Sequence, residues 1–171
     1  RNVYFGGKVQ IGVFSETENP EMRRVGLYDS EIRDCTINDG VLIADVSLLQ
    51  SYTIGRNAVL RNVGSVVVDG NTAFGNGTEI AVLNEGGGRT IKMYDHLTAQ
   101  IAYLMALYRH RPRMLECLNS LIDTYVESCK SSQGETGEYS VVVNCKTLKN
   151  VRVGSFVRLE GVERLEEGTI V

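Results

Sequence analysis

The stretch INDGVLIADVSLLQSYTIGRNAVLRNVGSV, residues 37–66, decides the fold class because large aliphatic residues recur in it at steps of six or five. These residues are Ile37, Ile43, Leu49, Ile54, Leu60 and Val66. In an α-helix, positions six apart lie about 240° apart around the axis, so these side chains would not share one face. The spacing instead favours short strands, each with one inward aliphatic side chain, that are separated by corners.

The corners between these strands are rich in Gly, Asn and Asp, the residues that tolerate a positive φ. They are Asn38-Asp39-Gly40, Gly55-Arg56-Asn57, Asp69-Gly70-Asn71 and Gly75-Asn76-Gly77. Three strands with three corners close one triangular coil, and successive coils stack through parallel backbone hydrogen bonds. The six-residue step recurs elsewhere in the chain, from Phe74 to Ile80, from Val142 to Leu148, and through Val153, Leu159, Leu165 and Val171.

Over residues 30–83 and 141–171 this pattern resembles the left-handed parallel β-helix of the hexapeptide-repeat proteins. The left-handed crossovers of that fold are an exception to the usual right-handed rule. The alternative is an ordinary β-sandwich in which the spacing is coincidental.

Helical spacing replaces the six-residue period in residues 84–137. Asp95 can cap a first helix whose apolar stripe is Leu97, Ile101, Leu104, Met105 and Tyr108. Pro112 suits the first turn of a second helix whose stripe is Leu115, Leu118, Ile122, Tyr125, Val126 and Cys129. We therefore expect a mainly β chain, a single-stranded left-handed parallel β-helix interrupted by an inserted α-helical hairpin. Its parts would be first coils over 1–83, a Gly-rich loop with two helices over 84–137, and resumed coils over 138–171 that continue beyond this fragment.

A narrower resemblance rests on several short segments in a fixed order. They are Phe74-Gly75-Asn76-Gly77, Asn84-Glu85, Gly87-Gly88-Arg89, Tyr94-Asp95 and Ala106-Leu107-Tyr108-Arg109-His110-Arg111-Pro112. This order is similar to a bacterial family of long, uncharacterised β-helix proteins, related by fold to sugar acyltransferases and nucleotidyltransferases. The resemblance implies that the chain is the front portion of a longer protein, and it guides architecture more than chemistry.

Composition disfavours several classes of function. The 171 residues carry a formal net charge of −3, which disfavours a generic nucleic-acid binder. No apolar run is long enough to cross a bilayer, and nothing near Arg1 resembles a signal peptide, so we expect a cytoplasmic protein without a membrane partner. Cys35, Cys117, Cys129 and Cys145 form no CxxC pair, so we expect buried thiols in a reducing compartment rather than a metal site.

Two familiar enzyme classes are also excluded. A γ-type carbonic anhydrase shares the β-helix but needs three histidines on zinc, whereas this chain has two. A Ser-His-Asp hydrolase of the α/β type needs a Gly-x-Ser-x-Gly elbow, which the sequence lacks.

The first candidate site is the segment from Asn84 and Glu85 through Gly87 and Gly88 to Arg89. Its three consecutive glycines allow backbone N–H groups to converge on an anion, and Arg89 could add a charged fork. A phosphate of a sugar nucleotide or of coenzyme A would fit there. The alternative is a plain exit from a coil into a helix, with Arg89 on the surface.

The second candidate site is Arg109, His110 and Arg111. Two guanidiniums would hold a phosphate or carboxylate, and His110 could act as a general base near neutral pH. The alternative is that basic residues simply follow the negative C-terminus of the first helix. The remaining histidine, His96, falls in the first turn of that helix, where a surface position is the alternative to a role in catalysis.

Three functions remain open from the sequence. The first is a hexapeptide-class transferase that moves an acyl group from acetyl-coenzyme A to a sugar or sugar nucleotide, and we expect it to be a homo-oligomer, a trimer or a dimer. The second is a non-catalytic scaffold whose helical hairpin mediates oligomerisation. The third is a sugar-nucleotide-binding accessory region in which Gly87, Gly88 and Arg89 hold the pyrophosphate.

Overall fold

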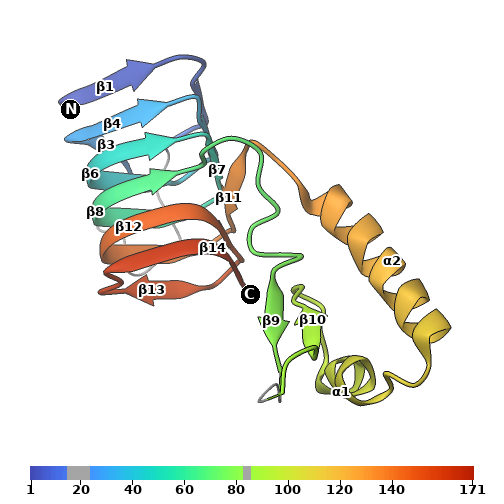
Figure 1. Ribbon diagram of the computed structural model, residues 1–171. Helices are drawn as coiled ribbons and strands as arrows, with labels where there is room; N and C mark the ends of the chain where they lie inside the picture. Colours follow the sequence, from blue (N-terminus) through green and yellow to red (C-terminus); the bar gives the residue numbers. More distant parts are fainter. Residues whose placement is uncertain (15–23, 83–85) are drawn as a thin grey trace. The chain divides into compact units, whose positions relative to one another are not determined.

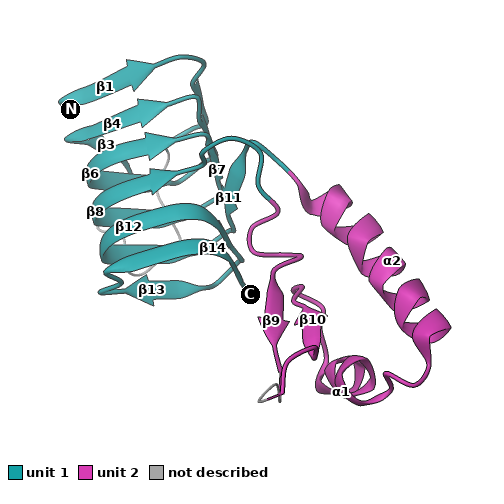
Figure 2. Ribbon diagram, viewed as in Figure 1, with its two compact units in different colours: residues 1–72, 131–171 teal, residues 73–130 magenta. Residues whose placement is uncertain are grey.

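Residues 1–14, 24–82 and 86–171 are described by the computed structural model, and most of their strands are parallel (Figure 1). The chain divides into two compact units (Figure 2). Unit 1 comprises residues 1–72 and 131–171, and unit 2 comprises residues 73–130. The protein is therefore mainly β, with two helices confined to the segment that interrupts unit 1.

Unit 1 contains, within the described residues, one sheet of twelve strands. They are β1 (Val3–Gly6), β2 (Gln10–Ile11), β3 (Gly26–Tyr28), β4 (Ser30–Arg33), β5 (Thr36–Ile37), β6 (Leu42–Gln50), β7 (Tyr52–Ile54), β8 (Val59–Val67), β11 (Gly134–Thr136), β12 (Val141–Val153), β13 (Arg158–Glu160) and β14 (Arg164–Ile170). The sheet runs in the order β1-β4-β6-β8-β12 and returns through β11-β7-β5-β2. Figure 1 shows these strands stacked in successive layers from the N-terminus to the C-terminus.

The strand registers show that each predicted aliphatic residue stacks on its counterpart in the next layer. Ile37 pairs with Ile54, and Ile43 pairs with Leu60, so three of the predicted steps make up one coil. The stacked residues form three inward columns, which hold Leu27, Ile43, Leu60, Val142 and Leu159 in the first, Ile32, Leu49, Val66, Leu148 and Leu165 in the second, and Ile37, Ile54, Thr136, Val153 and Ile170 in the third. The middle members of each column are fully buried, which confirms the predicted core of parallel, stacked strands.

Two of the predicted inward positions are wrong. Val171 is exposed, and Ile170 occupies the third column instead because the last step is five residues rather than six. The step from Phe74 to Ile80 does not belong to the coils, since Ile80 lies in β9 (Glu79–Ala81), which pairs with β10 (Thr90–Lys92) in a separate antiparallel sheet.

Each predicted corner contains a residue with positive φ, namely Gly40, Asn57, Gly70 and Gly75, and two further sets of corners occur at positions that the sequence analysis did not single out. After the first column, Asp45, Asn62 and Asn144 have φ values of 55°, 52° and 56°. After the second column the same conformation is adopted by Asp34, Ser51, Asn150 and Glu167. Each of these residues follows its inward aliphatic by two positions, whereas the non-glycine residues with positive φ after the third column, Asn57, Tyr139 and Phe156, follow the inward residue by three.

The chain leaves the stack where this corner rule cannot be met. The residue two positions after Val66 is Val68, and a β-branched side chain is strongly disfavoured at positive φ. Beyond it, Thr72 and Ser131 form an antiparallel bridge with N···O distances of 3.0 and 2.9 Å. Unit 2 is therefore inserted between the second and third inward positions of a single coil, and the bridge closes its base.

A buried tyrosine spans the coil that contains the insertion. Tyr52 is fully buried, and its ring lies so close to Gly134 that a Cβ there would come within 2.5 Å of it. Its hydroxyl donates to the carbonyl of Val151 at 2.7 Å and accepts from the Val151 N–H at 3.3 Å. Burial raises the pKa of Tyr52 to about 12, so the hydroxyl keeps its proton and continues to donate at neutral pH.

Unit 2 consists of the β9–β10 hairpin, α1 (Ala99–Leu107) and α2 (Pro112–Cys129). Its core contains Ile91, Met105, Ala106 and Ile122, with Leu97, Ile101, Leu115, Leu118 and Val126 packed around them. The two predicted stripes thus pack on each other and on β10, except that Tyr108, the last member of the first stripe, is 38% exposed and the prediction is wrong there. The unit starts at Ala73, before the predicted boundary at 84, because β9 pairs with β10 rather than with a coil.

The predicted start of the first helix is wrong by one turn. Thr98 is the N-cap, and its hydroxyl accepts from the Ile101 N–H. Asp95 instead accepts a hydrogen bond from the Tyr125 hydroxyl at 2.7 Å, which ties the segment before α1 to α2.

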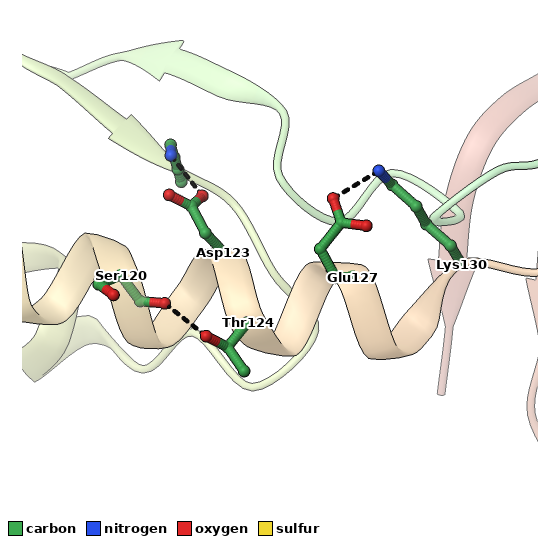
Figure 3. Close-up of polar contacts among 6 residues, drawn as sticks. Ser120, Asp123, Thr124, Glu127 and Lys130 are labelled. Atoms are coloured by element: carbon green, nitrogen blue, oxygen red, sulfur yellow. Dashed lines mark hydrogen bonds and ion pairs between the residues drawn. The ribbon is translucent and has the colours of Figure 1, made fainter.

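Polar contacts on α2 complete the packing of unit 2 (Figure 3). Asp123 forms an ion pair with Lys92 of β10, and Glu127 pairs with Lys130 at 2.6 Å. The Thr124 hydroxyl donates to the carbonyl of Ser120 at 2.9 Å within the helix. The Lys92–Asp123 pair therefore adds to the apolar core in holding α2 against the hairpin.

We expect Tyr52→Phe to lower the free energy of unfolding by about 1–3 kcal/mol, because the buried Val151 N–H and carbonyl would lose their hydrogen-bond partner. Urea unfolding of the variant and of the unchanged chain measures the difference. The control is Tyr103→Phe, since Tyr103 is 59% exposed. Equal stability of Tyr52→Phe and the unchanged chain would show that the hydroxyl does not stabilise the coil.

At the exposed corner residue Asp45, we expect valine to destabilise the fold by about 1–2 kcal/mol, whereas glycine should have little effect. Thermal unfolding of Asp45→Val and Asp45→Gly separates loss of the side chain from backbone strain, because both variants lack the carboxylate. Identical melting temperatures for the two would contradict the corner rule.

Candidate functional site

The described part of the Gly-rich segment, residues 86–89, is exposed and lies between β9 and β10 in the chain. The Val82 N–H donates to the Arg89 carbonyl at 2.9 Å, which closes the hairpin. Gly87 and Gly88 have φ values of 78° and 81°, and a Cβ on either would meet no atom within 4 Å. These glycines are therefore required by backbone conformation rather than by crowding. The predicted Asn84 and Glu85 lie outside the described residues.

One hydrogen bond brings the second candidate cluster to this hairpin. The Arg109 guanidinium donates to the carbonyl of Thr90 at 3.2 Å, one residue after Arg89. The α1–α2 turn, residues 108–111, thus lies against the start of β10. Arg109 of the second predicted cluster therefore lies next to Thr90, the residue that follows Arg89 of the first cluster, and both arginines are exposed. The contribution of Thr90 was not visible in the sequence, because it acts through its backbone.

His110 is exposed, and its ring contacts the ring of Tyr108 at a centroid distance of 5.6 Å. Tyr108 in turn meets Tyr103 edge-on at 6.5 Å. The imidazole is open to solvent and contacts an aromatic surface rather than the floor of a cavity. This setting favours a role at the edge of a ligand more than that of an oriented general base.

The charges of the turn are unbalanced. No acidic residue occurs from His96 to Leu115, a stretch that contains Arg109, Arg111 and Arg113. Arg109 follows the C-terminus of α1, where a cation is favourable, so part of its placement has a local explanation. Arg111 and Arg113 lie at the N-terminus of α2, whose first turn carries no acid and where cations are unfavourable. A bound anion would offset this cost. Arg113 was absent from the sequence-based site, although the acid-free stretch could have signalled it.

His96 belongs to a different cluster. Its exposed ring lies 5.5 Å from the ring of Tyr125, whose hydroxyl donates to Asp95. The hydrogen bond to Asp95 is the main cause that raises the pKa of Tyr125, so the phenol stays protonated. This arrangement stabilises the start of α1 and gives His96 a structural neighbour rather than a reacting partner.

The thiols mostly follow the prediction. Cys35, Cys129 and Cys145 are buried, whereas Cys117 of α2 is exposed, so the expectation of four buried thiols is wrong at that position. Burial raises the pKa of Cys35 to about 11, which keeps its thiol protonated and unreactive. Among residues 1–14, 24–82 and 86–171, no three His, Cys, Asp or Glu side chains gather closely enough to bind a metal ion. Neither described helix has the length and apolarity to cross a membrane.

Comparison with known proteins places the chain in a family. Residues 1–171 match a family described as a domain of unknown function, DUF4954. The chain belongs to this family. A relative in Treponema pallidum (strain Nichols), described as an uncharacterised protein, is 24% identical over 187 residues, which cover 99% of this chain and 25% of the relative. This DUF4954 chain thus spans about a quarter of the length of the curated relative that it matches. No solved structure matches it.

Proposed function

We propose that unit 1 is a left-handed parallel β-helix of the hexapeptide-repeat type. Three observations support this proposal. Parallel strands stack coil on coil, three aliphatic columns fill the interior, and residues at positive φ recur at fixed corner positions. Members of that fold class provide the precedent for the activity proposed next.

For activity, we propose that the protein is transferase-like and acts on a sugar or nucleotide compound whose phosphate binds at Arg109 and Arg111. The observation that carries this proposal is the Arg109–Thr90 hydrogen bond, which brings Arg109 to the residue that follows the Gly87–Arg89 segment. Guanidiniums form charge-assisted, often bidentate bonds to phosphate. No acidic residue in the α1–α2 turn or in the first turn of α2 balances the positive charge of Arg111 and Arg113.

In acyl transfer from acetyl-coenzyme A, the residue between the two arginines would supply the proton step. His110 would take the proton from an acceptor hydroxyl as the hydroxyl oxygen attacks the thioester carbonyl, and the proton would then pass to the departing thiolate. Because His110 is exposed and packs only against an aromatic ring in the contacts described above, this step needs ordering by the bound ligand. Phosphate binding is therefore the primary role of the turn, and transfer depends on it.

We expect UDP-N-acetylglucosamine or acetyl-coenzyme A to raise the melting temperature of the chain. A ligand at about 100 times its Kd adds about 2.7 kcal/mol of stability. Arg109→Ala/Arg111→Ala should abolish the shift, whereas Arg56→Ala, which removes an exposed arginine of unit 1, should leave it unchanged. No shift with either compound at millimolar concentration, or an equal shift in the double variant, would overturn the proposal.

A second candidate is the scaffold role, in which the helices mediate oligomerisation. It is favoured by α1, where Gln100 is the sole polar side chain apart from the hydroxyl of Tyr103, yet Tyr103 and Leu107 are exposed. A helix that is apolar on all sides is normally covered. If the helices mediate assembly, Tyr103→Ser/Leu107→Ser should lower the mass measured by light scattering. A chain that is monomeric before substitution would exclude this role.

A further inference from the structure

The exposed face of α1 carries apolar side chains directly beside the arginines. Tyr103 and Leu107 are four residues apart, so they share one face of the helix, and they are 59% and 41% exposed. Tyr108 is 38% exposed, and its ring meets that of Tyr103. On the other side of the helix, Met105 and Ala106 are buried in the core of unit 2. The apolar residues on the exposed face are therefore surplus to the packing of the unit.

These residues and the arginines that follow them in the chain are all exposed at the end of α1, in the α1–α2 turn and at the start of α2. We call this set of residues the aromatic–arginine tip, and it consists of Tyr103, Leu107, Tyr108, Arg109, Arg111 and Arg113. All six residues are exposed, and no acid lies between them in the sequence. The Arg109–Thr90 hydrogen bond fixes the cationic side of the tip to the β9–β10 hairpin.

The tip combines cationic and apolar side chains, and this combination distinguishes between the ligands that could bind there. A free nucleotide would engage the arginines and leave Tyr103 and Leu107 in water. A second copy docked through the same tip would bring the arginines of both copies together, because a two-fold interface places equivalent residues near each other. The occupant that matches both halves is anionic and apolar at once. A bilayer with anionic headgroups has this combination, since Tyr favours the headgroup level, Leu the acyl boundary and Arg the phosphates.

We propose that the aromatic–arginine tip docks on anionic phospholipid, so that unit 2 binds its phosphate at a membrane surface. The inference rests on the phosphate recognition by Arg109 and Arg111 in the proposed function and names the source of that phosphate. Docking of this kind is peripheral and requires no membrane-spanning helix. Each arginine near an anionic surface strengthens binding about fivefold, and the effect is screened by salt.

The test is co-sedimentation of the 171-residue chain with vesicles of phosphatidylcholine alone or mixed equally with phosphatidylglycerol. Binding of UDP-N-acetylglucosamine to the same samples is measured in parallel. We expect binding to the mixed vesicles only, weakened at high salt. Tyr103→Ser/Leu107→Ser should reduce vesicle binding at least tenfold and leave nucleotide binding intact, whereas Arg109→Ala/Arg111→Ala should abolish both. The matched control is Leu121→Ser, which removes an exposed leucine of α2 outside the tip.

The outcomes distinguish the inference from the proposed function. Nucleotide binding without vesicle binding overturns the inference and leaves the proposed function standing. Vesicle binding that needs the arginines, without nucleotide binding, supports the inference and overturns the sugar-nucleotide assignment. Equal binding to both kinds of vesicle, or unchanged binding by Tyr103→Ser/Leu107→Ser, overturns the inference. A mass that depends on Tyr103 and Leu107 in the absence of vesicle binding shows that a second copy covers the tip, and this too overturns it.

Discussion

Parallel pairing between successive coils is the constraint on which the rest of unit 1 depends. Because Ile37 lies on Ile54 and Leu49 lies on Val66, every inward position must suit the residues above and below it. The backbone must then turn at corresponding points of successive coils, and the corners there favour Asn, Asp and Gly, although Tyr139 and Phe156 also adopt a positive φ. A residue without a side chain, such as Gly134, leaves space inside the stack. The ring of Tyr52 covers Gly134, and its hydroxyl donates a hydrogen bond to the carbonyl of Val151 in β12.

The sequence predicted the repeated part of this fold well and the interruption less well. The columns were visible because one aliphatic residue marks each strand, and the helices were visible from their stripes. Ile80 was misplaced because a hairpin strand and a coil strand have the same local composition, and only the partner, β10, distinguishes them. Thr136 could not be recognised as a member of the third column, since a polar residue breaks the aliphatic pattern there. Val68, the residue that cannot turn, was a usable signal for the point of departure.

The candidate site shows a similar division. The sequence identified the two basic clusters, because charge and glycine content are local properties. The hydrogen bond from Arg109 to the Thr90 carbonyl depends on the fold of unit 2. The sequence does not predict this bond, because its acceptor is a backbone atom. The sequence also did not reveal the exposed apolar face of α1. Residues that pack into the core, such as Met105, and residues that stay exposed, such as Leu107, are equally apolar, and only the fold distinguishes them. The charged residues thus allowed the sequence to predict an anion site at the α1–α2 turn. The exposed apolar face beside the turn could be identified only from the packing of α1.

The bridge between Thr72 and Ser131 has a consequence for the length of the inserted segment. The inserted segment leaves and re-enters the coil at neighbouring points, Thr72 and Ser131. The geometry of this junction does not depend on the length or sequence of the inserted segment. Loop-closure entropy rises only slowly with length, so such a junction accommodates large segments at modest cost. The coils around this position can therefore stay paired when the inserted segment is lengthened or shortened.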